Sequence, residues 1–298
     1  MKILLLGKNG QVGWELQRSL ALLGEVTACD FDSPGELKAD FKDPESMLAL
    51  IRRLRPSAIV NSAAHTAVDK AESEPDLART INATTPGALA REAAAIGATM
   101  VHYSTDYVFD GSGDKPHDES TPTGPLSVYG HTKLEGEELV RSSGCRHLIL
   151  RTSWVYGARG GNFARTMLRL AAEREELKVI DDQVGAPTGA ELLADITALA
   201  LQRVAADGSL AGTYHCVADG HTSWHGYARF VIEWARAHGH PIKVQADRIG
   251  AIASTDYTTP ARRPLNSRLA TGKLRQAFGV HLPDWRCGVE RMLTEVLG

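Results

Sequence analysis

The sequence has few cysteines and no long apolar run near its start. These features argue against a disulfide-rich, zinc-binding or membrane-spanning protein. Its four cysteines lie far apart, with no Cys-x-x-Cys pair and no His/Cys cluster at zinc spacing. We therefore expect buried thiols in a reducing compartment. The apolar run at residues 3–6 is too short for a signal-peptide core or a membrane span. These features predict a cytoplasmic protein without a membrane partner.

An excess of charge of one sign is also lacking. The chain has 33 Lys and Arg against 36 Asp and Glu, a formal net charge of -3, and no basic run. We therefore expect no nucleic-acid partner, because polyanion binding needs a basic surface. At 298 residues and 43% hydrophobic content, the chain can form one large domain or a large and a small one.

A glycine-rich turn follows the first apolar run. Gly7, Gly10 and Gly13 stand in the spacing G-x-x-G-x-x-G, and apolar residues at 12, 16, 20 and 23 predict a helix that opens near Gln11. Glycines in a strand–turn–helix context let the backbone approach a pyrophosphate at the helix N-terminus. The alternative is a tight turn without a ligand.

Acidic residues follow at the places where an adenosine ribose or adenine would lie. Residues 25–29 predict a second strand that ends at Asp30, which favours NAD. Lys8 inside the glycine turn could instead meet a 2'-phosphate, so cofactor preference stays open. The segment 40–43 lies near the end of an expected third strand. It could reach the adenine or cap a helix that begins at Pro44.

Strands and helices then alternate, which predicts an α/β doubly wound parallel sheet. We expect strands over 58–64, 99–104 and 147–152 and helices over 44–55 and 76–96. The alternation loosens after residue 156. We therefore expect a nucleotide-binding domain over 1–156, to which later segments can return, and a smaller α+β part, mainly substrate-binding, over 157–298. The basic loop 259–267 is either solvated or a phosphate clamp.

Tyr129 and Lys133 stand four residues apart, so a helix would place both on one face. A lysine ammonium beside a phenol stabilises phenolate and is expected to lower the tyrosine pKa, which suits acid/base chemistry. The pair alone is weak evidence, since such pairs are common on solvated helix faces. Thr105, at an expected strand end, could share a hydrogen bond to a substrate carbonyl with the tyrosine.

The chain resembles the extended short-chain dehydrogenases/reductases through three motifs in order on a Rossmann pattern. These are G-x-x-G-x-x-G at 7–13, Ser-Thr at 104–105 and Tyr-x-x-x-Lys at 129–133. More narrowly, the chain is similar to the dTDP-4-dehydrorhamnose reductase family through GKNGQVGWELQRSL, VHYSTDYVFDG, VYGHTKLEGE, DDQVGAPTGAELLAD and RRPLNSRL. The resemblance implies NADPH- or NADH-dependent reduction of the 4-keto group of dTDP-4-dehydro-β-L-rhamnose to dTDP-L-rhamnose, a precursor of cell-surface polysaccharide. It also implies a homodimer and a magnesium ion.

The resemblance further implies roles for individual residues. Tyr129 would protonate the 4-keto oxygen, Lys133 would lower the tyrosine pKa and hold the nicotinamide ribose, and Thr105 would polarise the carbonyl. The cofactor site would also contain Gly7, Gly10, Gln11, Val12, Gly13, Asp30, Asp40, Phe41, Ala63, Ala64 and Tyr103. Asp106 and Trp154 would line the sugar site and Arg263 would face the diphosphate. Glu15, Glu191 and Glu295 match the family's metal positions, although nothing in their spacing demands a metal.

Three alternatives share part of this pattern. A sugar-nucleotide 4,6-dehydratase would carry an Asp-Glu pair after the threonine, whereas Asp106 is followed here by Tyr107, which favours plain reduction. An epimerase needs only reversible hydride transfer and stays open. A non-catalytic subunit, similar to the regulator of methionine adenosyltransferase, would keep the nucleotide site without turnover. Intact Thr105, Tyr129 and Lys133 argue against that reading.

Overall fold

A six-stranded parallel sheet forms the centre of the larger part of the protein. The computed structural model describes residues 1–298, and the strand order is β10-β5-β4-β3-β1-β2. The strands are β1 (Lys2–Leu6), β2 (Glu25–Cys29), β3 (Ala58–Asn61), β4 (Thr99–Thr105), β5 (Arg146–Thr152) and β10 (Gly212–His215). The inner strands are almost wholly buried, because helices cover both faces of the sheet. The predicted α/β doubly wound fold is confirmed.

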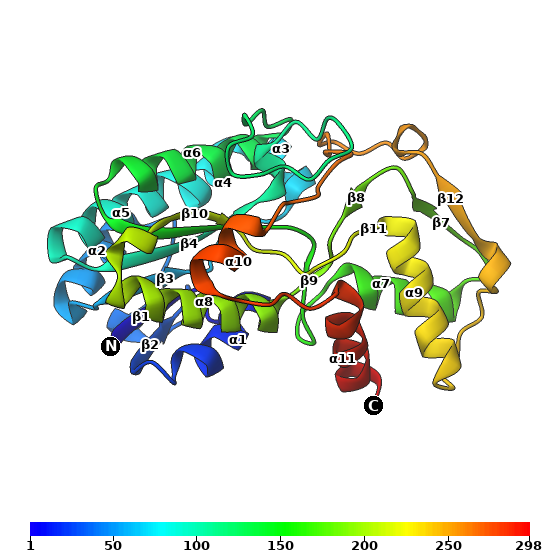
Figure 1. Ribbon diagram of the computed structural model, residues 1–298, viewed down its shortest axis with the longest axis horizontal. Helices are drawn as coiled ribbons and strands as arrows, with labels where there is room; N and C mark the ends of the chain where they lie inside the picture. The colour runs from blue at the N-terminus through cyan, green and yellow to red at the C-terminus, as the bar shows by residue number, and fades with distance from the viewer.

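Alternate residues of β1 supply the two hydrophobic cores. Ile3 and Leu5 pack on one side with α1 (Gln11–Leu20), α8 (Ala190–Ala206) and α10 (Gly272–Phe278), and Leu4 and Leu6 pack on the other. That second side is covered by α2 (Pro44–Leu54), α5 (Thr85–Ile96) and α6 (Val128–Ser142). In Figure 1, α6 lies above the sheet and α2 at its left edge. The two helical layers cover the faces of the sheet and leave the C-terminal ends of its strands facing the smaller part.

The smaller part lies on the right of Figure 1 and contains short strand pairs and helices. Its strand pairs are β7 (Leu177–Ile180) with β12 (Ile249–Ile252), β8 (Val184–Gly185) with β11 (Thr222–Ser223), and β6 (Val155–Tyr156) with β9 (Thr188–Gly189). Its helices are α7 (Phe163–Glu173), α9 (Trp224–Ala237) and α11 (Trp285–Leu297). These elements form a smaller α+β part, whereas β10 joins the main sheet and α8 and α10 pack against it.

The expected third strand before Asp40 is wrong. Residues 38–43 form an irregular segment and a turn, because the Ala39 amide donates to the Asp30 carbonyl (2.9 Å) and folds the chain back onto the end of β2. Asp43 instead caps α2, where its carboxylate accepts a hydrogen bond from the Ser46 amide (3.3 Å).

The long helix expected over 76–96 is interrupted. The chain forms α3 (Val68–Ser73), α4 (Pro75–Arg79), a π-helical turn over Thr80–Thr84, and then α5. Pro86 has no amide hydrogen for the carbonyl four residues earlier, which favours an irregular turn at that point. The turn directs Asn82 inward, where its side chain donates to the His65 carbonyl (3.2 Å) and to Thr132 Oγ1 (3.1 Å).

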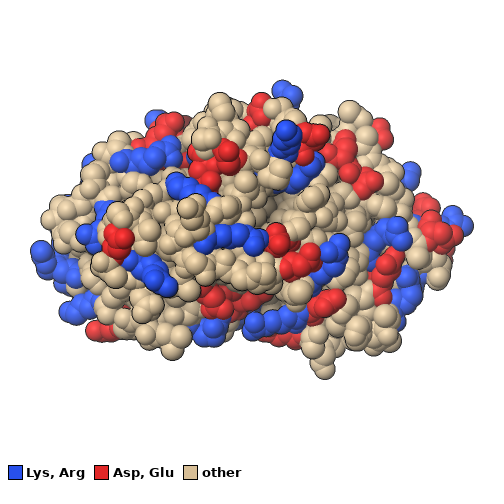
Figure 2. All heavy atoms as spheres, viewed as in Figure 1, with Lys and Arg blue, Asp and Glu red and all other residues tan.

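The surface carries charges of both signs. Figure 2 shows Lys and Arg interspersed with Asp and Glu over the visible face. No helix combines the length and apolar character needed to cross a bilayer.

Candidate active site

A cavity of about 940 Å³ lies at the C-terminal ends of the parallel strands. The connection after β1 leads to β2 on one side, whereas the connection after β3 leads to β4 on the other, and doubly wound folds bind ligands at such a switch point. Most of the residues predicted from the sequence line it: Gly7, Gly10, Gln11, Val12, Asp30, Asp40, Phe41, Ala63, Ala64, Tyr103, Thr105, Asp106, Tyr129, Lys133 and Trp154. The chain thus brings the glycine turn and the Tyr/Lys pair to one cavity.

The glycine turn places the N-terminus of α1 at the cavity. Gly7 has a positive φ of 87°, and a Cβ built on Gly13 would lie 1.9 Å from the Gly7 carbonyl oxygen. Gly13 therefore allows close packing of the helix on the turn and does not line the cavity itself. Gly10 is the N-cap of α1 and lines the cavity. The free backbone amides of the first turn of α1 are therefore placed to bind a pyrophosphate.

The end of β2 presents acidic and aromatic groups to the same cavity. The Asp30 carboxylate accepts hydrogen bonds from the Asn9 amide (3.0 Å) and the Phe31 amide (2.8 Å), and the Asn9 side chain donates to Asp32 (2.8 Å). Phe31 is 64% exposed and lines the cavity, as does Lys42. Neither was predicted as a site residue, although an aromatic residue directly after a strand-end acid was a usable signal.

Tyr129 lies in the first turn of α6, which Ser127 caps by accepting a hydrogen bond from the Gly130 amide (3.2 Å). Burial raises the pKa of Tyr129 to about 12, while the Thr105 hydroxyl lowers it and the Asp106 charge raises it. The net shift is opposite to the predicted one, because removal of the phenol from water outweighs the stabilising contacts. The tyrosine is therefore protonated at neutral pH.

Lys133 is 2% exposed, and its side chain points to β4. Its ammonium donates a hydrogen bond to the Tyr103 carbonyl at 2.6 Å. Burial lowers the pKa of Lys133 to about 8, and the Glu137 carboxylate opposes that shift. The ammonium is thus engaged by a backbone carbonyl of β4, and burial of the phenol decides the direction of the Tyr129 pKa shift.

Asp106 is a buried carboxyl beside Thr105. One oxygen accepts a hydrogen bond from the Thr105 hydroxyl (3.0 Å), and the other has no hydrogen-bond partner. Burial raises the pKa of Asp106 to about 6, and the nearby hydroxyls of Ser267 and Thr105 oppose the rise. A carboxyl group with a free oxygen next to Tyr129 is well suited to contact a sugar hydroxyl.

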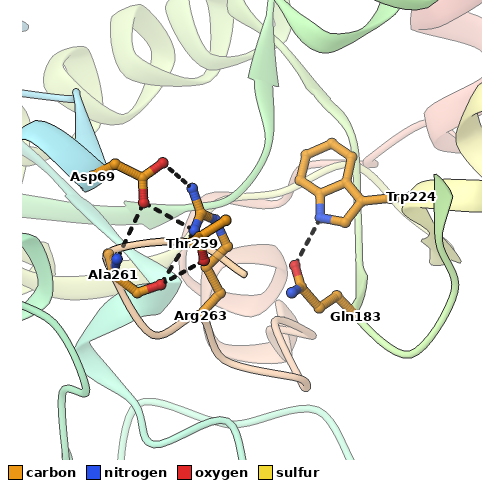
Figure 3. A network of polar contacts seen from close by, with 6 residues as sticks. All are labelled: Asp69, Gln183, Trp224, Thr259, Ala261 and Arg263. Carbon is orange, nitrogen blue, oxygen red and sulfur yellow. Dashed lines mark hydrogen bonds and ion pairs between the residues drawn. The ribbon is translucent and has the colours of Figure 1, made fainter. Parts of the chain in front are cut away.

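Two stacked tryptophans line part of the cavity. Trp154 and Trp224 stack with ring centroids 3.6 Å apart, and the Trp224 indole donates to the Gln183 side chain at 3.1 Å (Figure 3). Trp154 has a positive φ of 50°, and a Cβ on Gly185 would lie 2.7 Å from its ring. The sequence predicted Trp224 only as the start of a helix, because its neighbour in the stack lies 70 residues earlier.

Arg263 lies outside the residues that line the cavity. Its guanidinium makes a two-point contact with Asp69 of α3, at 2.7 and 3.1 Å, and also donates to the Ala261 carbonyl (Figure 3). Its charge lowers the pKa of Tyr107, a cavity residue, so the guanidinium lies close to the rim. The basic loop is therefore attached to the larger part through an ion pair.

The three predicted metal ligands lie on separate helices. Glu15 is on α1, Glu191 begins α8, and Glu295 is exposed on α11. No group of three or more His, Cys, Asp or Glu in the chain is arranged to hold a metal ion. The single chain therefore offers no magnesium site at these positions.

Comparison with known proteins agrees with the geometry. A family model described as the RmlD substrate binding domain matches residues 1–297. A dTDP-4-dehydrorhamnose reductase from Shigella flexneri is 56% identical over 296 residues, covering 99% of this chain and 98% of the relative.

Solved structures extend the comparison. A dTDP-4-dehydrorhamnose reductase from Clostridium acetobutylicum has a TM-score of 0.90 at 35% identity, with all of both chains covered. One from Bacillus anthracis, in complex with NADP, has a TM-score of 0.87 at 32% identity, covering 99% of this chain and 100% of that one. The present chain belongs to the dTDP-4-dehydrorhamnose reductase family.

Proposed function

We propose that this protein reduces the 4-keto group of dTDP-4-dehydro-β-L-rhamnose to give dTDP-L-rhamnose in polysaccharide-precursor biosynthesis. The observation that carries the proposal is one cavity holding both the glycine turn and the group of Thr105, Tyr129 and Lys133. Family membership over nearly the whole chain supports the substrate assignment. NADPH or NADH, when bound, supplies the hydride.

The glycine turn and the N-terminus of α1 would hold the cofactor pyrophosphate, because Gly10 leaves space and amide donors there. Asp30, Asp40 and Phe41 would surround the adenosine half. Lys133 would hold the nicotinamide ribose through its ammonium. We assign cofactor binding mainly to residues 1–156 and substrate binding mainly to 157–298.

Tyr129 would donate the proton that completes the reduction. With a pKa near 12, its phenol carries that proton at neutral pH, as a donor must. The Thr105 hydroxyl lies close enough to lower the tyrosine pKa through a hydrogen bond, so both groups can reach one carbonyl oxygen. The phenolate left after transfer recovers its proton from solvent.

Asp106 and Trp154 would contact the sugar, and Arg263 would contact the diphosphate. The guanidinium is already engaged by Asp69, so a diphosphate must either displace that carboxylate or share the arginine with it. We also propose a cytoplasmic location and a homodimer. Any role for magnesium would need acids from two copies, and activity measured with and without a chelator tests it.

The test is NADPH oxidation, followed by absorbance, with enzymatically generated dTDP-4-keto-L-rhamnose and analysis of the product. Tyr129→Phe should fold and bind NADPH but lose about 100-fold or more in kcat, since a positioned acid contributes roughly that factor. Tyr214→Phe is the matched control, because it removes a phenol that bonds the Leu210 carbonyl outside the cavity. Full turnover by Tyr129→Phe would refute the mechanism, and absent turnover by the unmodified protein would refute the function.

A further inference from the structure

One face of α6 carries an ionisable residue at every fourth position. Tyr129, Lys133, Glu137 and Arg141 follow one another at this spacing, so their side chains share that face. Glu137 is completely buried, as is nearly all of Lys133. A buried carboxylate is costly unless it is paired, so its partners indicate why it is there.

The Glu137 carboxylate is held by two arginines. Arg151 of β5 donates from Nε (2.8 Å) and from one terminal nitrogen (2.7 Å), which is the two-point geometry that arginine and carboxylate prefer. Arg141, one turn further along α6, donates to the same carboxylate at 2.8 Å. These contacts hold the pKa of Glu137 below its usual range despite burial, so Glu137 is ionised at neutral pH.

Cations outnumber carboxylates in the layer between α6 and the sheet. Lys133 faces His102 of β4, which is 1% exposed and stays neutral because burial drives its pKa well below the usual value. Arg151 is the other cation on the sheet side. Asp106, which follows β4, acts on the Tyr129 phenol. Glu137 is therefore the carboxylate that offsets the Lys133 charge.

The carboxylates of the other elements packed against α6 are engaged elsewhere. Glu92 of α5 pairs with Arg52 of α2 at 2.7 Å. The Glu72 carboxylate of α3 accepts from the Val128 amide at the start of α6 (2.9 Å), and Arg79 of α4 pairs with Glu135 on its outer side (2.7 Å). The π-helical turn has no ionisable residue.

We propose that Glu137 is a positioning residue of the reduction, whose buried carboxylate, fixed by Arg151, keeps the Lys133 ammonium charged and in place beside the cofactor site. The proposal rests on the proposed function. The pKa of Lys133 is about 8 with Glu137 present, so loss of the carboxylate moves it lower and leaves less of the ammonium at neutral pH. Glu137 acts through Lys133 and touches neither substrate nor cofactor.

The test compares pH profiles of kcat/KM for Glu137→Gln and the unmodified protein. The alkaline limb should move to lower pH by about one unit, which means roughly fivefold lower activity at pH 8 and recovery towards the unmodified value near pH 6. A purely structural role would instead lower activity by the same factor at every pH. That outcome, or an unshifted limb, overturns the proposal.

Two further variants keep the test decisive. Glu137→Gln leaves the Arg151 charge buried and unpaired, which can unfold the protein, so Arg151→Met is added to remove that cation. The acid shift should persist in the double variant, and a folded double variant with an unmodified profile refutes the proposal. Glu138→Gln is the matched control, because it removes the same charge from an exposed neighbouring position.

A second readout separates this proposal from the proposed function. If the unmodified protein does not turn over the ketosugar, the function fails, whereas NADPH affinity still reports on Lys133. In fluorescence titrations at increasing pH, the affinity for NADPH should begin to decrease at a lower pH in Glu137→Gln than in the unmodified protein. Equal pH dependence of NADPH affinity in the two proteins contradicts the positioning role.

Discussion

Substitution of Gly13 by alanine tests the packing of the cofactor turn. The added Cβ would lie 1.9 Å from the Gly7 carbonyl oxygen, 2.7 Å from the Gly7 carbonyl carbon and 2.9 Å from Ser62 Oγ. The Ser62 hydroxyl donates to the Leu6 carbonyl at 2.7 Å, so it cannot turn away without losing that bond. The helix and the turn must therefore separate by roughly 1 Å or more before ordinary contact is restored.

The expected cost follows from overpacking. Forced insertion of a methyl group into a tight contact typically destabilises by about 1–3 kcal/mol. Better helix propensity for alanine returns about 0.5–1 kcal/mol, so the net loss for Gly13→Ala should lie near 1–2 kcal/mol. At roughly 2–4 °C for each kcal/mol, the melting temperature should fall by about 2–8 °C. NADPH affinity should also fall, because the pyrophosphate amides move with the helix.

Gly10→Ala is the matched control, because it adds the same methyl group three residues earlier. Its Cβ would meet only the Gly7 carbonyl oxygen, at an ordinary 3.5 Å, so stability should change by less than about 1 kcal/mol. The methyl group lies at the cavity, and NADPH affinity should fall about tenfold or more.

Thermal unfolding without ligand and fluorescence titration with NADPH measure the two effects. Gly13→Ala with an unchanged melting temperature would refute the packing argument. Gly10→Ala with unchanged NADPH affinity would refute the assignment of this turn to the cofactor.

Three other outcomes are expected. Burial raises the pKa of Asp106 to about 6, so the protonated carboxyl stabilises the fold below about pH 4, and this stabilisation is lost as the pH rises through 6. The melting temperature of Asp106→Asn relative to the unmodified protein should therefore rise between about pH 4 and 6 and then stay constant. A difference that does not change with pH would contradict this. Gly185→Ala would place a Cβ 2.7 Å from the Trp154 ring and should raise the KM for the sugar nucleotide while NADPH affinity holds; an unchanged KM in steady-state assays argues against a substrate role for that ring. Arg263→Gln should raise that KM by about tenfold or more with kcat nearly constant, whereas Asp69→Asn should not; equal effects would indicate that the ion pair is only structural.

Local patterns in the sequence were sufficient for most of the larger part. The bounds of β2 agree with those predicted, and those of α2, β4 and β5 differ by one residue each, because apolar runs and helical periodicity act over neighbouring residues. The segment 38–43 was mispredicted, since a short run before a cap resembles a strand and its fate depended on a bond to Asp30. The interruption at Thr80–Thr84 lay inside a continuous helical pattern.

Spacing along the chain was enough to predict that a glycine turn follows the first strand and that Tyr129 and Lys133 share one helix face. Only the tertiary structure decided that Trp224 stacks on Trp154 and that Arg263 is held by Asp69, because these partners lie far apart in sequence and meet through packing. The tertiary structure also decided that the pKa of Tyr129 is raised and not lowered.

The physical reason is that spacing fixes which groups can share an element, while burial and distant charges fix how those groups ionise. A phenol beside a lysine in sequence predicts a lowered pKa. The same phenol, withdrawn from water and beside a lysine that bonds the Tyr103 carbonyl, has a raised one.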